Sequence, residues 1–447
     1  MRIAVAITIA ALTLLAACGG TPASVGFAPI DHVCAPGQQI ECACPGDAPK
    51  SVQSCRSDGS GYEACACTAG IDAGAAGDAV SSIDTRSPQA DGGLGTDGAR
   101  PGIGPDAGGS DAPSCSGSLD SDPENCGACG HSCLGGACQA GLCAFTELAA
   151  NQVQPSGLAV ADGNVFWTTE GGHPDYVGQV LSLSLMAAPG TTPTILATNQ
   201  LYPRAVAFAD GALFWGNQGD AKLGKWASDS TIAIGGGLAN GHINNIVVDS
   251  AYVYFSMLIS DSNGASPSGA IGRCSISGCG STIETIATSP DAQIYGLALD
   301  SGVLYWSKYA ANGTVSRLVL DGRSSPETIA TGQAMPLQLA AFGGRVYWTS
   351  PGTSTVVSVS ALGGEPPTIV ARGQQAPWGI AVDASGVYWT NYDGDHDSAG
   401  QVMKLSPGSS TPIPLASGQS RPGHVRIDDA YAYWTNTGNG SIRRVPK

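Results

Sequence analysis

The sequence predicts an all-β protein whose larger part is a seven-bladed β-propeller. A short phrase, one small or aliphatic residue followed by two aromatic residues, recurs seven times, and successive copies lie 40 to 51 residues apart. A period of this length, built from strands and marked by aromatic residues, is typical of propeller blades. The triplets occupy 165–167, 213–215, 253–255, 304–306, 346–348, 387–389 and 432–434.

The sixth repeat shows the expected strands most clearly. Residues 379–382 form a short inner strand, and 387–390 form a second strand rich in β-branched and aromatic residues. A third strand follows at 400–405 and a fourth at 413–416. Four consecutive strands are the content of one propeller blade, so each repeat corresponds to a blade.

The two ends of the propeller segment complement each other. The seventh repeat stops after its third strand, 441–445, whereas a spare fourth strand, 146–149, stands immediately before the first repeat. We expect the spare strand to complete the last blade. Hydrogen bonds between the two ends of the chain would then close the ring at 144–447 and leave no open sheet edge.

Six of the seven triplets end in tryptophan. We expect these side chains to pack in the wedges between neighbouring blades, where each buries roughly 150–250 Å², rather than to contact a ligand. They are Trp167, Trp215, Trp306, Trp348, Trp389 and Trp434.

The amino-terminal segment has the layout of an export signal. A basic start is followed by an apolar run at 3–17, too short for a spanning helix, which needs about 20 apolar residues. Residues 15–18, which end in Cys18, resemble the lipobox of bacterial lipoproteins. The resemblance implies cleavage after residue 17, lipidation of Cys18, a tether over 18–33 and a location in the cell envelope, at the outer membrane or cell surface. The alternative is an ordinary signal peptide with an incidental cysteine.

The remaining cysteines occur in even groups: six within 34–67, six within 115–143 and one local pair. Even groups in small glycine-rich modules of an exported chain predict disulfide frameworks, although six cysteines allow fifteen pairings. A zinc site at Cys126 and Cys129, with His131 nearby, is the alternative. The disulfide candidates are Cys34, Cys42, Cys44, Cys55, Cys65, Cys67, Cys115, Cys126, Cys129, Cys133, Cys138, Cys143, Cys274 and Cys279.

The segment 68–114 separates the two cysteine-rich modules. It is rich in Gly, Ala, Pro and Asp and contains no aromatic residue, so it buries too little apolar surface to fold and should be a disordered acidic linker. Its regularly spaced aspartates serve solvation or attract calcium weakly. The chain has 20 basic and 36 acidic residues, a net charge of −16, which argues against nucleic acid and anionic lipid as partners. Membrane attachment would then come from the lipid alone.

Two resemblances extend this reading. The cysteine-rich segments, in particular 58–62 and 122–130, look like modules of surface lipoproteins from myxobacteria and their relatives. The phrases at 387–391 and 432–436 are similar to the Tyr-Trp-Thr-Asp propellers of low-density-lipoprotein receptors, and this similarity covers 145–447. The chain departs from that family in having Asn, Ser or Gly where the family has Asp, and seven copies rather than six. The resemblance therefore implies the architecture and says little about a partner.

One face of the propeller is the expected binding surface. Loops from fourth to first strands and from second to third strands emerge on the same face and vary freely over a rigid ring. Residues at the starts of the first strands differ in polarity from blade to blade. This variation is expected of a shared binding mouth, and purely structural positions would tolerate it too. The candidate binding residues are Arg204, Asn244, Tyr295, Gln338, Trp378 and His424.

A loop with alternating carboxylates is the most specific local feature. Asp393, Asp395 and Asp397 could converge on calcium, which prefers oxygen ligands, or could form a solvated acidic loop. The loop does not match an EF-hand, because Ser398 and Lys404 stand where that motif has Gly and Glu.

Two functional classes follow. The favoured one is a monomeric, non-catalytic module that binds a protein or glycan partner at the propeller face. The alternative is a metal-assisted lyase or lactonase with its site at the propeller mouth, because seven-bladed streptogramin lyases look similar in their Gly-Ile-Ala and aromatic phrases. Its acid–base candidates are Glu170, His173, His396 and His424.

Overall fold

The computed structural model describes residues 39–42, 51–54, 117–127, 129–235, 241–259, 268–279, 283–392 and 398–447. The chain divides into two units, Met1–Pro105 and Asp106–Lys447. In the first unit, β1 (Gln39–Cys42) pairs antiparallel with β2 (Ser51–Ser54). The signal peptide, Cys18 and the linker predicted from the sequence lie outside the described residues. Within the described ranges, no helix is long and apolar enough to cross a membrane.

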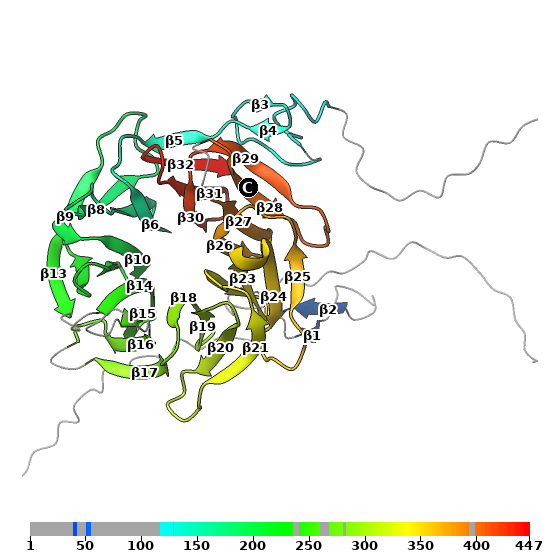
Figure 1. Cartoon of the computed structure of the whole chain (residues 1–447). Helices are drawn as coiled ribbons and strands as arrows, with labels where there is room; N and C mark the ends of the chain where they lie inside the picture. The colour runs from blue at the N-terminus through cyan, green and yellow to red at the C-terminus, as the bar shows by residue number, and fades with distance from the viewer. Residues whose placement is uncertain are drawn as a thin grey trace, which may run out of the picture. The chain divides into compact units, whose positions relative to one another are not determined.

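The second unit contains a ring of seven four-stranded antiparallel sheets (Figure 1). Blade 1 comprises β6 (Pro155–Ala161), β7 (Asn164–Thr169), β8 (Val177–Ser184) and β9 (Thr194–Leu201). Blade 2 comprises β10 (Pro203–Ala209), β11 (Ala212–Asn217), β12 (Leu223–Ala227) and β13 (Ser230–Gly235). Blade 3 comprises β14 (Gly241–Val248), β15 (Tyr252–Ile259), β16 (Ser268–Ser275) and β17 (Glu284–Ser289). Blade 4 comprises β18 (Gln293–Asp300), β19 (Val303–Tyr309), β20 (Gly313–Val319) and β21 (Glu327–Gln333).

Blade 5 comprises β22 (Leu339–Phe342), β23 (Arg345–Ser350), β24 (Thr355–Ser360) and β25 (Thr368–Ala371), with the 3-10 turn η1 (Pro351–Thr353) between β23 and β24. Blade 6 comprises β26 (Pro377–Asp383), β27 (Gly386–Asn391), β28 (Gly400–Leu405) and β29 (Ile413–Gln419). Blade 7 comprises β30 (Pro422–Ile427), β31 (Tyr431–Asn436), β32 (Ser441–Pro446) and β5 (Thr146–Ala149). The predicted all-β, seven-bladed propeller is confirmed.

The short turns between first and second strands follow from the sequence. In blades 1 and 2 the turn residues are Asp162-Gly163 and Asp210-Gly211, and all four have positive φ between 48° and 71°. Two consecutive positive φ values define the tight hairpin turn that matches strand twist, and Asp-Gly adopts it readily. These turns hold each inner strand in register with the aromatic strand that follows.

The ends of the chain close the ring as the sequence predicts. β5 pairs with β32, with Ile442 opposite Ala149 and Arg443 opposite Glu147. Arg443 also bonds the Glu147 carboxylate at 3.0 Å and lies over the ring of Phe145, with 4.3 Å from its guanidinium carbon to the ring centroid. Blade 7 therefore takes three strands from the carboxyl end and one from the segment before blade 1 (Figure 1).

The aligned tryptophans are buried between the blades, which confirms their predicted packing role; the most exposed of the six is Trp306, at 6%. The hydroxyl residue that follows the tryptophan ties one blade to the next. Thr390 donates to the Gly423 carbonyl at 2.6 Å and accepts from the Gly379 amide at 2.9 Å. Thr349 donates to the Trp378 carbonyl at 2.7 Å. These bonds fix the starts of the inner strands, where the candidate binding residues lie.

A small disulfide-linked module precedes the closing strand. Its hairpin consists of β3 (Cys138–Gln139) and β4 (Leu142–Cys143), and two disulfides join Cys126 to Cys138 and Cys133 to Cys143. These cysteines share a hydrophobic cluster with Leu415 of blade 6 and Trp434 of blade 7. A third disulfide joins Cys274, in β16, to Cys279, which follows the strand. The disulfide prediction is confirmed for these six cysteines.

Candidate functional site

A concave pocket lies on the face where fourth strands lead into first strands. Its volume is about 350 Å³, and blades 1, 2, 6 and 7 all contribute to its lining. Three of the six residues proposed from the sequence, Arg204, Trp378 and His424, line this pocket. A few polar groups converging in an aromatic pocket of this size are typical of a small-molecule site. We call it the upper pocket.

Two pairs of aromatic side chains form walls of the upper pocket. Trp378 and Tyr392 of blade 6 lie 5.3 Å apart between ring centroids, with 33° between their planes. Tyr176 of blade 1 and Tyr202, just before blade 2, lie 5.1 Å apart. The buried Tyr295 packs edge-on against Trp378, with 6.4 Å between the ring centroids. The pocket therefore offers large, rigid, partly exposed aromatic surfaces.

An ion pair provides part of the charge of the upper pocket, which Arg421 also lines. The Nε of Arg204 lies 3.2 Å from Oε1 of Glu170, a residue that is 8% exposed. The guanidinium also lies over the Tyr202 ring, 5.7 Å from its centroid, and donates to Gln218 at 3.4 Å. Tyr295 and Glu170 raise the pKa of Arg204 against the opposing effect of burial, so this side chain is charged. Arg204 and Glu170 together present a donor and an acceptor to a polar ligand.

His424 belongs to a buried polar layer at the ring axis. Its Nδ1 lies 3.0 Å from the Ser156 carbonyl, and its Nε2 lies 3.5 Å from the amide nitrogen of Gln338. Gln338 in turn accepts from Asn245 at 2.7 Å. Because a carbonyl can only accept, these partners place the proton on Nδ1. Burial, assisted by the charges of Arg426 and Arg204, lowers the pKa of His424 to about 3. The imidazole is therefore neutral, with both nitrogens engaged.

The other three candidate residues lie just below the pocket surface. Asn244 is buried, donates to the Ile294 carbonyl at 3.3 Å and accepts from Gln218 at 3.2 Å. Tyr295 and Gln338 are buried as well. These residues support the pocket and do not line it. The proposed calcium ligands Asp393, Asp395 and Asp397, with His396, lie outside the described residues.

The acid–base candidates are only partly assembled. Glu170 and His424 both line the upper pocket, and His173 contacts its rim through Tyr176, at 5.6 Å between ring centroids. Glu170 is held by Arg204, while His424 is neutral and bonded through both nitrogens. Glu170 and His424 therefore do not form a free acid–base pair in the pocket.

Sequence reasoning missed several lining residues, although a common signal identifies three of them. Gln154, Tyr202 and Arg421 each line the upper pocket and each directly precede the proline that begins a first strand. All three have positive φ, between 51° and 53°. The left-handed backbone is unusual for these residue types and turns the chain sharply at the mouth. The recurring X-Pro dipeptide at the blade start is thus a sequence marker of this face.

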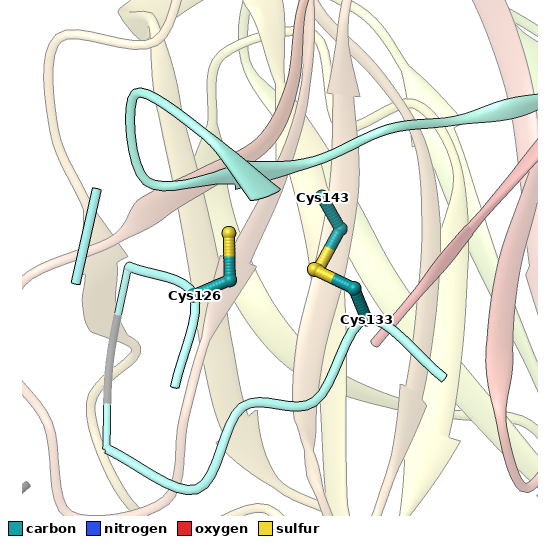
Figure 2. A group of neighbouring side chains, drawn as sticks. All are labelled: Cys126, Cys133 and Cys143. Atoms are coloured by element: carbon teal, nitrogen blue, oxygen red, sulfur yellow. A yellow bond between two sulfur atoms is a disulfide. The ribbon is translucent and has the colours of Figure 1, made fainter. Parts of the chain in front are cut away.

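The cysteine cluster of the small module is not a metal site. The sulfurs of Cys126, Cys133 and Cys143 lie within 4.8 Å of one another (Figure 2). All three are disulfide-bonded, and Cys129 is disulfide-bonded too. Zinc requires thiolate ligands, and a disulfide sulfur is not one. The zinc alternative at Cys126 and Cys129 is therefore wrong.

Solved structures similar to this chain include both enzymes and a binding assembly. A streptogramin B lyase shares 14% identity over 68% of this chain and 96% of its own, with a TM-score of 0.54. The virginiamycin B lyase from Staphylococcus aureus shares 15% over 68% and 99%, with a TM-score of 0.53. A nidogen/laminin complex shares 15% over 56% and 94%, with a TM-score of 0.44. No protein-family model matches the chain, and no curated protein matches its sequence. At these identities the likeness shows the fold alone.

Proposed function

We propose that this chain is a lipid-anchored protein of the cell envelope whose propeller binds a glycan, without catalysis, at the upper pocket. The observation that carries the proposal is the pair of aromatic walls, Trp378–Tyr392 and Tyr176–Tyr202, beside the Arg204–Glu170 ion pair. A sugar ring presents C–H groups on its faces and hydroxyls at its edge. The faces suit aromatic side chains, and the hydroxyls suit a paired donor and acceptor.

The shape of the site favours a glycan over a protein partner. A protein interface typically buries about 800 Å² on each partner over a broad surface, whereas the upper pocket is a hollow of about 350 Å³. That volume is in the range of small-ligand sites, roughly 300–1,000 Å³, and accommodates one projecting sugar unit. A protein that inserts a single side chain is the competing outcome of the test below.

A binding role agrees better with the pocket chemistry than the lyase or lactonase alternative. General acid–base catalysis works best with a group whose pKa lies near the working pH and that is free to exchange a proton. The pKa of His424 is far below that range, and Ser156 and Gln338 occupy its nitrogens. The likeness to lyases supports the shared fold and gives no support to a shared reaction.

The test is a glycan-binding screen of the exported chain, followed by titration of the best binder. Trp378→Ala should weaken binding at least about tenfold, because an exposed aromatic anchor is lost. Leu362→Ala is the control, since Leu362 is 75% exposed and is not one of the residues that line the upper pocket. Equal binding by the two variants would refute the site, and capture of a protein but no glycan would refute the ligand class. Turnover abolished by a chelator would instead favour the enzyme.

The anchor has its own test. Cys18→Ser should move the protein from the membrane fraction to the soluble fraction, because an acidic chain gains little from anionic lipid and the acyl chains supply the attachment. Metabolic labelling with a palmitate analogue should mark the wild type and not the variant. Unchanged membrane retention of Cys18→Ser would contradict the lipid anchor and leave the glycan site untouched.

A further inference from the structure

A second cavity occupies the opposite half of the ring axis. Its volume is about 410 Å³, and it shares no lining residue with the upper pocket. The first strands of all seven blades line it, mainly with Ala, Val, Leu and Ile. Asn245 and Gln338, from the polar layer that includes His424, also line it. We call it the lower cavity.

One blade differs from the other six in a residue that lines the lower cavity. In every blade, one first-strand residue pairs with the middle aromatic of the triplet, and that residue lines the cavity. It is small in six blades: Ala159, Ala207, Val247, Ala298, Ala340 and Ala381. In blade 7 it is Arg426, opposite Tyr433. Packing between blades is satisfied by alanine at this position, so packing does not explain the arginine.

Arg426 has no anionic partner within the described part of the chain. Its Nη1 donates to the carbonyl of the adjacent Val425 at 2.9 Å, and it is the one charged side chain among the described residues that line the lower cavity. The apolar surroundings lower the pKa of Arg426 to about 10, so it stays protonated at neutral pH. Arg426 is half-buried, and a partly desolvated charge without a counter-ion costs free energy of folding, which an anionic ligand would offset.

We propose that the lower cavity binds a small organic monoanion, with its carboxylate on Arg426 and an apolar body against the aliphatic walls. Phe208, Val248 and Leu299 form part of the wall that such a body would contact. A single guanidinium matches a single carboxylate and can bind it through two parallel hydrogen bonds. A multiply charged anion is disfavoured, because the chain carries a net charge of −16. Three acidic residues also adjoin the cavity-lining residues in sequence: Asp300 in β18, Asp383 in β26 and Asp428 just after β30.

The experiment is calorimetric titration of the full chain with benzoate and with benzamide, its neutral counterpart. We expect benzoate to bind one to one and benzamide at least about tenfold more weakly, since the amide lacks the charge that pairs with arginine. Arg426→Met should also weaken benzoate binding at least about tenfold. The same variant should melt at a higher temperature without ligand, because the unpaired charge is gone. Trp378→Ala, in the upper pocket, should bind benzoate like the wild type.

Five results would overturn the proposal, the last of them with Trp378→Ala. The first is no binding of benzoate or hexanoate at about 10 mM, near the weakest affinity of interest. The second is equal binding of benzoate and benzamide, and the third is unchanged benzoate binding by Arg426→Met. The fourth is binding of inorganic phosphate or chloride as tightly as benzoate. The first, second and fourth comparisons use wild-type protein, so the test holds even if the variant fails to fold. Loss of benzoate binding in Trp378→Ala would place the anion in the upper pocket and would overturn the lower site as well.

Discussion

The indole Nε1 of Trp389 donates a hydrogen bond of 2.8 Å to the side-chain oxygen of Gln374, across the junction between blades 5 and 6. The same oxygen accepts from Asn391 at 3.0 Å. Equivalent bonds, 2.8 to 3.1 Å long, join Trp167 to Gln152, Trp215 to Gln200 and Trp434 to Gln419. In each case the glutamine stands 15 residues before the tryptophan. The repeated glutamine therefore links the outer part of one blade to the aromatic strand of the next.

Gln374→Ala should lower the free energy of unfolding by about 1–3 kcal/mol, because it leaves a buried indole N–H without an acceptor. Gln333→Ala is the matched control. Gln333 stands at the same spacing before Trp348, but the Trp348 Nε1 has no hydrogen-bond partner among the described residues. Urea unfolding of both variants measures the difference. Equal losses would show that the glutamine acts through packing and that the hydrogen bond contributes nothing measurable.

The sequence predicts the tryptophans but not the glutamines, for a physical reason. A buried aromatic repeats in every blade because the wedge between sheets repeats, so its period is visible in the chain. The partner of a polar atom depends on the register between two blades, and Trp348 shows that the same spacing need not give the same bond. For a related reason, only some of the residues that line the upper pocket could be predicted from the sequence. Strand starts are visible in the sequence, whereas Tyr202 and Arg421 reach the mouth through positive φ values.

Two tryptophans of blade 6 should respond differently to truncation. Trp389 is fully buried, so Trp389→Ala should lower the free energy of unfolding by about 3–5 kcal/mol. Trp378 is partly exposed at the upper pocket, and Trp378→Ala should cost only about 1 kcal/mol, mainly its contact with Tyr392. Chemical denaturation of both variants in parallel provides the comparison. Similar losses would mean that Trp378 belongs to the core, and its use as a binding probe would then be invalid.

Deleting 146–149 should destabilise the whole propeller well beyond the loss of four residues. Blade 7 would keep three strands and expose the edge of β32, which now pairs with β5. An unpaired edge recruits other chains, so we expect a lower melting temperature together with oligomers in size-exclusion chromatography. The control is deletion of four residues within 68–114, outside the described part of the chain. A monomeric deletion variant with an unchanged melting temperature would contradict closure by β5.

His424 should make the stability of the propeller dependent on pH below neutrality. Its pKa is about 3 in the folded protein, against about 6.5 in an unfolded chain. Between these values the unfolded state binds one proton more than the folded state, so the free energy of unfolding falls as the pH is lowered. The contribution is complete above about pH 6.5 and decreases toward pH 3, by at most about 1.4 kcal/mol per pH unit.

The measurement compares wild type with His424→Asn, whose amide can still donate to the Ser156 carbonyl. Carboxylates titrate in both proteins, so the difference between their pH profiles isolates His424 from other groups. Between pH 7 and pH 5 the wild type should lose about 2 kcal/mol more than the variant. Arg204 and Arg426 reinforce the effect, because each disfavours a second positive charge on the imidazole. Parallel profiles would mean that His424 accepts a proton in the folded state. The floor of the upper pocket would then be open to acid–base chemistry, which would favour the lyase or lactonase alternative over a purely binding role.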